Sequence, residues 1–173
     1  HRDLHSFPTR RSSDLIYTKV HKIDTWAFAD IVAAPAVIMG QAIGRAANLL
    51  NGDAFGHPTG GNFGIIYPST TLAHQVYGNQ PLWPAEIWAG QIDVVIFVLL
   101  LMFRTTNHAK GQVFILYAVL YSLARFGLEF LRGDYGTLAF GLKSAQLTSL
   151  TVIIVGLLLF FWVGRKGKRI SER

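Results

Sequence analysis

The sequence contains no cysteine, and charged residues are scarce: Asp, Glu, Lys and Arg make up 15% of its 173 residues. An average soluble domain carries about 25% charged residues, so this chain has too few charges for an extensive surface in water. The absence of cysteine excludes a disulfide framework, a thiolate metal site and a cysteine nucleophile of the protein's own. Because 51% of the residues are hydrophobic, intrinsic disorder is excluded as well. The composition favours a membrane protein.

Basic residues outnumber acidic ones, and the formal net charge is +6. They are grouped at the ends of apolar runs rather than in one patch, which is typical of membrane proteins, so we expect no nucleic-acid partner. His57 and His74 are not clustered with other ligands in the sequence, and we expect no metal site. The sequence also lacks the common phosphate-binding, hydrolase and dinucleotide motifs, so no cofactor is expected.

The first 15 residues differ in character from the rest of the chain. The stretch HSFPTRRSSDL at 5–15 resembles a sequencing-adapter oligonucleotide translated by mistake, and it lacks the apolar stretch of a signal peptide. We therefore exclude residues 1–15 from the fold prediction and expect the native chain to resume near Ile16. On this interpretation, residues 16–173 are the C-terminal part of a longer protein.

Four apolar segments predict membrane-spanning helices, because a bilayer core of about 30 Å needs roughly 17 to 25 helical residues. Their apolar residues surround the whole helix circumference, which is typical of helices in lipid. The first segment is interrupted by Asp30 and Pro35. The predicted fold class is all-α, a polytopic transmembrane helical bundle, with spans at about 26–43, 87–103, 113–131 and 147–163.

Lysine and arginine positions predict the orientation of the bundle. The tail after the last span reads RKGKRISER, and such basic segments accumulate on the cytoplasmic side. Counting back from a cytoplasmic C-terminus places the connection 49–85 outside, and this connection contains no lysine or arginine. Structureless loops of that length are uncommon unless they are functional. We therefore expect one long, folded external loop.

The end of the first predicted span carries the motif GRAANLLNGDAFG. Arg45 and Asn48 are three residues apart, so they share a helix face, and Asn51 and Gly52 follow. An arginine can hold a phosphate with two hydrogen bonds, and asparagine amides add neutral hydrogen bonds beside it. The alternative is that Arg45 only anchors the helix by extending to the membrane surface.

The third predicted span ends on polar residues spaced four, four and three apart, which we expect on one stripe of a helix: Tyr121, Arg125, Glu129 and Arg132. A charge inside a span usually faces a partner or a water-filled cavity. Either Arg125 and Glu129 pair with each other, or the stripe faces a cavity and binds an anionic head group. In the second case Glu129 would orient an arginine or take a proton. The surplus of arginine over carboxylate favours an anionic ligand.

The segment WPAEIW lies between these two motifs. Anchoring at the membrane interface is sufficient to explain Trp83 and Trp88. Glu86, at the start of a predicted helix, either interacts favourably with the helix dipole or serves as an acid or base. Asp93 is a further charge inside a span, which we expect to face the other helices.

Together, GRAANLLNGDAFG, WPAEIW and YSLARFGLEFLRGD, in this order between the predicted spans, resemble the prolipoprotein diacylglyceryl transferase family. The resemblance covers about 16–173. It implies a bacterial inner-membrane enzyme of seven spans, of which the last four are present here. It also implies that the diacylglyceryl group of phosphatidylglycerol is moved to the lipobox cysteine thiol of a preprolipoprotein, forming a thioether and releasing glycerol phosphate.

The resemblance also implies roles for the site residues. Arg45, Arg125 and Glu129 would be catalytic, because arginines can stabilise the charge that develops on a departing phosphate ester. The residues expected to bind the substrate are Arg45, Asn48, Asn51, Gly52, Tyr121, Arg125 and Arg132.

Two departures from the family pattern stand out. The usual Pro-x-Gln-x-Tyr-Glu pattern is replaced at Pro84–Ala89, and the family's histidine-glycine-glycine segment would lie upstream of Ile16. We therefore expect this polypeptide to be inactive alone. The alternatives are a fragment of a lipid or anion transporter, which would carry charges along the depth of several spans, and a non-catalytic membrane scaffold.

Overall fold

The computed structural model describes residues 24–133, 141–167 and 169–170, and these are predominantly helical. The predicted foreign segment 1–15 lies outside the described residues. Two strands of two residues, β1 (His108–Ala109) and β2 (Arg169–Ile170), pair antiparallel. The helices are α2 (Thr25–Phe28), η1 (Ala29–Ala33), α3 (Ala34–Asn51), α4 (Leu72–Tyr77), α5 (Ala85–Arg104), α6 (Gln112–Leu128) and α7 (Ser144–Lys166).

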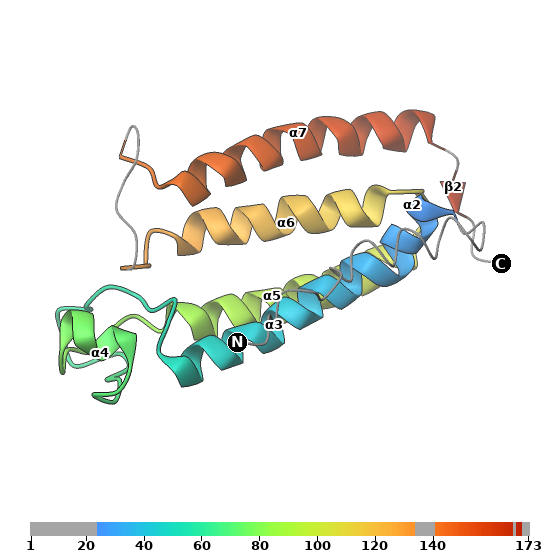
Figure 1. Cartoon of the computed structure of the whole chain (residues 1–173). Helices are drawn as coiled ribbons and strands as arrows, with labels where there is room; N and C mark the ends of the chain where they lie inside the picture. Colours follow the sequence, from blue (N-terminus) through green and yellow to red (C-terminus); the bar gives the residue numbers. More distant parts are fainter. Residues whose placement is uncertain (1–23, 134–140, 168, 171–173) are drawn as a thin grey trace, which may run out of the picture.

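The long helices lie side by side, with α6 between α7 and the α3–α5 pair (Figure 1). Within the described residues, three helical stretches are long and apolar enough to cross a membrane: Thr25–Asn51, Ala85–Arg104 and Ser144–Lys166. The prediction of a helical membrane bundle is therefore confirmed in this coarser form. The predicted span at 113–131 forms the shorter apolar helix α6, which ends at Leu128. A count of four spans stays a prediction.

The first helical stretch contains the two residues that the sequence marked as interruptions. The chain forms a π-helical turn at Ala29–Ala33, and Pro35 lies in the first turn of α3, where a missing N–H is tolerated. Asp30 is fully buried, and its carboxylate accepts hydrogen bonds from the backbone N–H groups of Gly111 (2.6 Å) and Phe114 (2.9 Å). Asp30 therefore caps the start of α6 from another helix.

Small and apolar side chains determine the packing of the bundle. One core joins α3, α5 and α6 through Ala34, Ile38, Ile96, Leu100 and Val113. Helix α7 approaches α6 closely at Gly156, where an added Cβ would lie 2.6 Å from Val119 Cγ2. Close approach at a small residue is typical of helix pairs in membranes. Most of the remaining surface of α5 and α7 is apolar and exposed, as expected for helices that face lipid.

The connection between α3 and α5 folds into a compact cap over one end of the bundle (Figure 1). Its core consists of Phe55, Tyr67, Ala73 and Leu82. Isolated β-bridges join Leu82 to Pro58 and to Ile65. The connection is shorter than the predicted 49–85, because α3 continues to Asn51 and α5 begins at Ala85. The connection is folded around this core, and one long loop outside the membrane stays a prediction.

Candidate functional site

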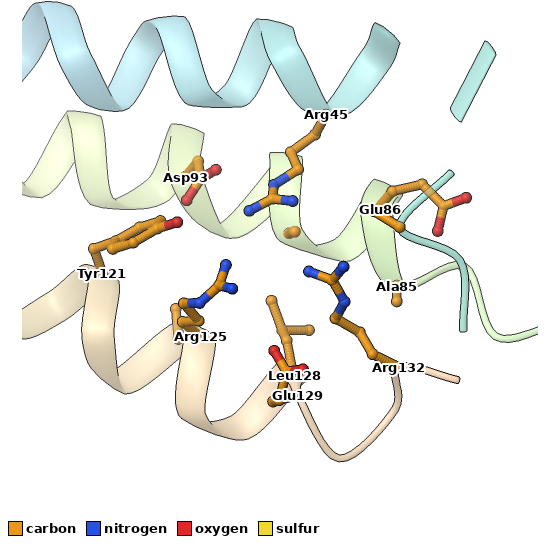
Figure 2. A pocket seen from close by; sticks show the side chains of 12 residues that line it. Arg45, Ala85, Glu86, Asp93, Tyr121, Arg125, Leu128, Glu129 and Arg132 are labelled. Carbon is orange, nitrogen blue, oxygen red and sulfur yellow. The ribbon is translucent and has the colours of Figure 1, made fainter. Parts of the chain in front are cut away.

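Three arginine side chains converge on one cavity below the cap. Arg45 extends from α3, Arg125 from the last turn of α6 and Arg132 from the segment after α6, and their guanidinium groups point toward a common centre (Figure 2). The cavity is lined by Arg45, Ala54, Ala85, Glu86, Ala89, Asp93, Tyr121, Ala124, Arg125, Leu128, Glu129 and Arg132. Residues of the Arg45 motif and of the Arg125 motif therefore line one cavity.

A glycine in α5 allows Arg45 to reach the cavity. Gly90 lies against Arg45, and an added Cβ at Gly90 would be 3.3 Å from the Cβ of Arg45. Any larger residue at position 90 would press on the base of the arginine side chain. The close packing of α3 on α5 therefore directs the guanidinium group past α5 and toward α6.

The structure corrects the prediction that the four polar residues of the third span lie on one helical stripe. Because α6 ends at Leu128, Arg132 belongs to no helix. Instead it forms an isolated β-bridge with Gly56 of the cap, and the N–H of His57 donates to the carbonyl of Leu131 (2.9 Å). Arg132 reaches the predicted cavity through this contact with the cap rather than through helical periodicity.

Lys143, just before α7, also binds the turn that follows α6 and carries Arg132. Its Nζ donates to the carbonyl oxygens of Glu129 (2.9 Å) and Arg132 (2.6 Å). The same Nζ lies 3.9 Å from Oε1 of Glu129. Sequence reasoning missed Lys143, because it follows a segment with no recognisable motif.

The ion pair between Arg125 and Glu129 that the sequence left open is not formed. The carboxylate of Glu129 faces Lys143 instead, and its Oε2 atom is buried with no hydrogen-bond partner. Among the residues that the structure describes, neither Arg45 nor Arg125 takes part in a hydrogen bond or an ion pair. Their N–H donors are therefore available to a ligand in the cavity.

Two carboxylates of α5 also line the cavity. Both were noted in the sequence, but their place in this cavity was not predicted. Glu86 is 1% exposed and Asp93 is 3% exposed. Both oxygens of Glu86 and the Oδ2 atom of Asp93 are buried without a hydrogen-bond partner in the described structure. Their spacing of seven residues puts both on one face of a helix, and this signal could have placed them together.

With these residues included, the lining holds three arginines and three carboxylates. The surplus of arginine in the stripe from Tyr121 to Arg132 therefore does not extend to the whole cavity. The unused N–H donors of Arg45 and Arg125 favour an anionic ligand instead, because a guanidinium group carries five N–H donors and no acceptor.

Asn48, Asn51 and Gly52 lie at the end of α3, and none of them lines the cavity. Asn48 is half-buried and Asn51 is exposed. Gly52 ends the helix in the left-handed conformation with φ of 65°, and an added Cβ would lie 2.5 Å from the Cβ of Thr71. Gly52 therefore has a structural role at this turn. Contacts of Asn48 and Asn51 with a substrate stay predictions.

The remaining predicted site residue, Tyr121, lines the cavity and stacks on Tyr117 with ring centroids 6.0 Å apart. The histidines of the cap bond to backbone: Nδ1 of His57 lies 3.0 Å from the carbonyl of Pro58, and Nδ1 of His74 lies 3.0 Å from that of Tyr67. In the described part of the chain, no three His, Asp or Glu side chains gather to hold a metal ion.

The fold and the site define an integral membrane protein with an arginine-lined polar cavity at one end of its helical bundle. Residues 13–162 match the model of the family described as prolipoprotein diacylglyceryl transferase. The chain belongs to this family.

Similar proteins include enzymes named phosphatidylglycerol–prolipoprotein diacylglyceryl transferase from three bacteria. The one from Oceanobacillus iheyensis is 34% identical over 163 residues, which are 92% of this chain and 55% of the relative. Those from Geobacillus kaustophilus and Thermosynechococcus vestitus are 34% and 36% identical, over 88% and 91% of this chain and 56% and 59% of the relatives. The chain spans about half the length of the curated relatives it matches.

Proposed function

We propose that this chain supplies the phosphate-binding part of an active site that transfers the diacylglyceryl group of phosphatidylglycerol. The acceptor is the lipobox cysteine thiol of a preprolipoprotein, and the product is a thioether. The observation that carries this proposal is the convergence of Arg45 and Arg125, whose donors have no partner among the described residues. The names of the relatives supply the two substrates.

The chemistry of the transfer suits this cavity. Sulfur attacks the glycerol carbon, and negative charge develops on the oxygens of the departing phosphate ester. Preorganised donors in a site of low polarity stabilise such charge strongly. The protein contains no cysteine, and it needs none, because the thiol arrives with the substrate.

The location that we propose is the bacterial inner membrane, with the C-terminus in the cytoplasm and the cavity toward the outer leaflet. The cavity lies at the cap end of the bundle, and the basic C-terminal end of α7 lies at the opposite end (Figure 1). This separation supports the orientation, since basic residues favour the cytoplasmic side.

The clustering of charge also supports an enzyme over a transporter. A transport pathway needs polar groups along the depth of the bundle. Here the three arginines gather at one end, in the last two turns of α3, the last turn of α6 and the segment that follows it.

The test is diacylglyceryl transfer from phosphatidylglycerol to a lipobox peptide in proteoliposomes, with binding of phosphatidylglycerol measured in parallel. Because the chain spans about half the length of its relatives, it is assayed in two forms: alone, and joined to the part of the Oceanobacillus iheyensis enzyme that it does not match. Arg45→Ala and Arg125→Ala are each expected to lower transfer by at least about 100-fold. The matched control is Arg104→Ala, because Arg104 lies at the other end of α5 and donates to the carbonyl of Ile31.

Undiminished transfer in both cavity variants would reject the proposed roles of the arginines. If neither form of the parent transfers the group, although it binds phosphatidylglycerol through Arg45, the site binds a lipid phosphate without catalysing transfer. That result would favour a transporter or a scaffold.

A further inference from the structure

Asp93 is a buried carboxylate whose presence the packing of the bundle does not explain. It is 3% exposed, and its Oδ2 atom has no hydrogen-bond partner in the described structure. A charged group inside a membrane helix is costly, and such residues usually serve a function. Since Asp93 also lines the arginine cavity, its acceptor oxygen is available to a molecule bound there.

The groups that face Asp93 come from two neighbouring helices. Arg45 of α3 is close enough to act on its carboxylate electrostatically. Tyr121 and Arg125 of α6 line the same part of the cavity, and Figure 2 shows all three side chains directed toward the space beside Asp93. Glu86, on the same helix, lies about two turns nearer the cap.

Asp93 lies at the end of the cavity that is farther from the cap (Figure 2). It is eight residues beyond Ala85, the first residue of α5, which corresponds to about 12 Å along the helix axis. Glu86 lies in the first turn of the same helix. In Figure 2 the two ends of the cavity are therefore distinct, with Asp93 and Tyr121 at the inner end and Glu86 and Arg132 at the outer end.

A phospholipid has a fixed order of groups along the membrane normal. With its phosphate on Arg45 and Arg125, its acyl chains extend toward the membrane interior. The glycerol carbon bonded to the phosphate oxygen then lies on the inner side of the phosphate. A sulfur that displaces the phosphate must approach this carbon from the side opposite to the breaking bond, which is the side of Asp93.

We propose that Asp93 is a catalytic residue that accepts the proton of the substrate thiol. This inference rests on the proposed transfer function. The thiol proton moves to a carboxylate oxygen of Asp93, and the sulfur forms a bond to the glycerol carbon. The bond from that carbon to the phosphate oxygen breaks, and its electron pair leaves with the glycerol phosphate, whose charge Arg45 and Arg125 stabilise. The glycerol phosphate leaves as a dianion, and the proton on Asp93 is released to water.

The test compares transfer by Asp93→Asn and Asp93→Glu with transfer by the parent. It uses the chain alone, or joined to part of its relative, whichever supports transfer. Asp93→Asn is expected to lower the transfer rate by about 100-fold, within the range of a lost proton acceptor. Asp93→Glu keeps a carboxylate and is expected to retain more than one tenth of the rate. The matched control is Gln91→Ala, an exposed position on the same helix.

Two further measurements separate proton transfer from a structural role. Binding of phosphatidylglycerol in nanodiscs should change less than about threefold in Asp93→Asn. Its residual transfer rate should rise about tenfold per pH unit between pH 6 and 8, because a free thiol with a pKa near 8.5 must ionise by itself. The parent rate should rise less steeply, since Asp93 supplies the acceptor.

Full transfer by Asp93→Asn would overturn the proton role and leave the proposed function intact. A loss of phosphatidylglycerol binding equal to the loss of transfer would also overturn it, because Asp93 would then only position Arg45. If the parent binds phosphatidylglycerol but transfers nothing, whether alone or joined to part of its relative, the proposed function and the role of Asp93 both fail.

Discussion

The side-chain nitrogen of Lys143 lies 2.6 Å from the carbonyl oxygen of Arg132, and this hydrogen bond joins the start of α7 to the turn that carries an arginine of the cavity. The same nitrogen also binds the carbonyl of Glu129. The last carbonyl groups of a helix lack partners within it, and here the lysine just before the next helix supplies one. The position of Arg132 therefore depends on how α6 and α7 pack.

Replacing Lys143 by methionine is expected to weaken both the fold and the binding of phosphatidylglycerol. The change removes two hydrogen bonds from a charged donor, which contribute about 1.5 to 3 kcal/mol each, and frees the turn at Arg132. The measurements are the thermal unfolding midpoint in detergent and binding to nanodiscs. Lys166→Met, at the exposed far end of α7, is the matched control. Lys143→Arg is expected to restore part of the binding, and equal effects at both lysines would contradict this role.

Asp30→Ala is expected to destabilise the bundle at the end opposite the cavity. The variant removes the acceptor for the backbone N–H groups of Gly111 and Phe114. Loss of such a cap costs about 0.5 to 2 kcal/mol, and the denaturant midpoint should fall accordingly.

The control for Asp30 is Asp24→Ala. Asp24 is exposed and accepts a hydrogen bond from Lys110 (2.5 Å), which holds the pKa of its carboxyl below the usual value. Its small contribution to stability is present above the ordinary aspartate pKa and declines as the pH falls below it. Asp24 also caps the start of α2, because it accepts hydrogen bonds from the backbone N–H groups of Trp26 and Ala27, but it does so at an exposed site. At neutral pH, Asp24→Ala should therefore change the midpoint less than Asp30→Ala, and the opposite order would show that burial of the Asp30 cap is unimportant.

Gly52→Ala is expected to destabilise the cap more than Gly60→Ala. Both glycines have positive φ, 65° and 74°, so alanine is strained at either position by about 1 kcal/mol or more. Only at Gly52 would the added Cβ also meet Thr71, at 2.5 Å, whereas it meets nothing within 4 Å at Gly60. Unfolding measurements on both variants separate the backbone strain from the clash. Equal losses of stability would show that the approach of Thr71 is unimportant.

Arg45→Lys is expected to bind phosphatidylglycerol several-fold more weakly than the parent, although the charge is kept. A guanidinium group binds phosphate with two parallel hydrogen bonds, whereas an ammonium group acts as a point charge. Titration of nanodiscs with increasing phosphatidylglycerol content measures the difference. Arg104→Lys is the control, since Arg104 lies at the other end of α5. Unchanged binding by Arg45→Lys would mean that charge alone determines recognition.

The helices and the principal arginines could be predicted from local patterns. Hydropathy and length mark the long helices, because a bilayer requires a minimum apolar length. The four-residue spacing from Tyr121 to Arg125 fixes a shared helix face wherever the helix packs, and both residues do line the cavity. The position of Asp93 on an inner face was also expected, and its burial agrees.

The composition and periodicity of this chain by themselves determined a helical membrane protein with arginines near the ends of two helices. Only the tertiary structure decided that Arg132 reaches the cavity through a β-bridge with Gly56, that Glu129 faces Lys143 instead of Arg125, and that Asn48 lies outside the cavity. The reason is physical: hydropathy and helical spacing act between near neighbours. A turn, an ion pair or a cavity instead depends on which distant segments meet when the helices pack.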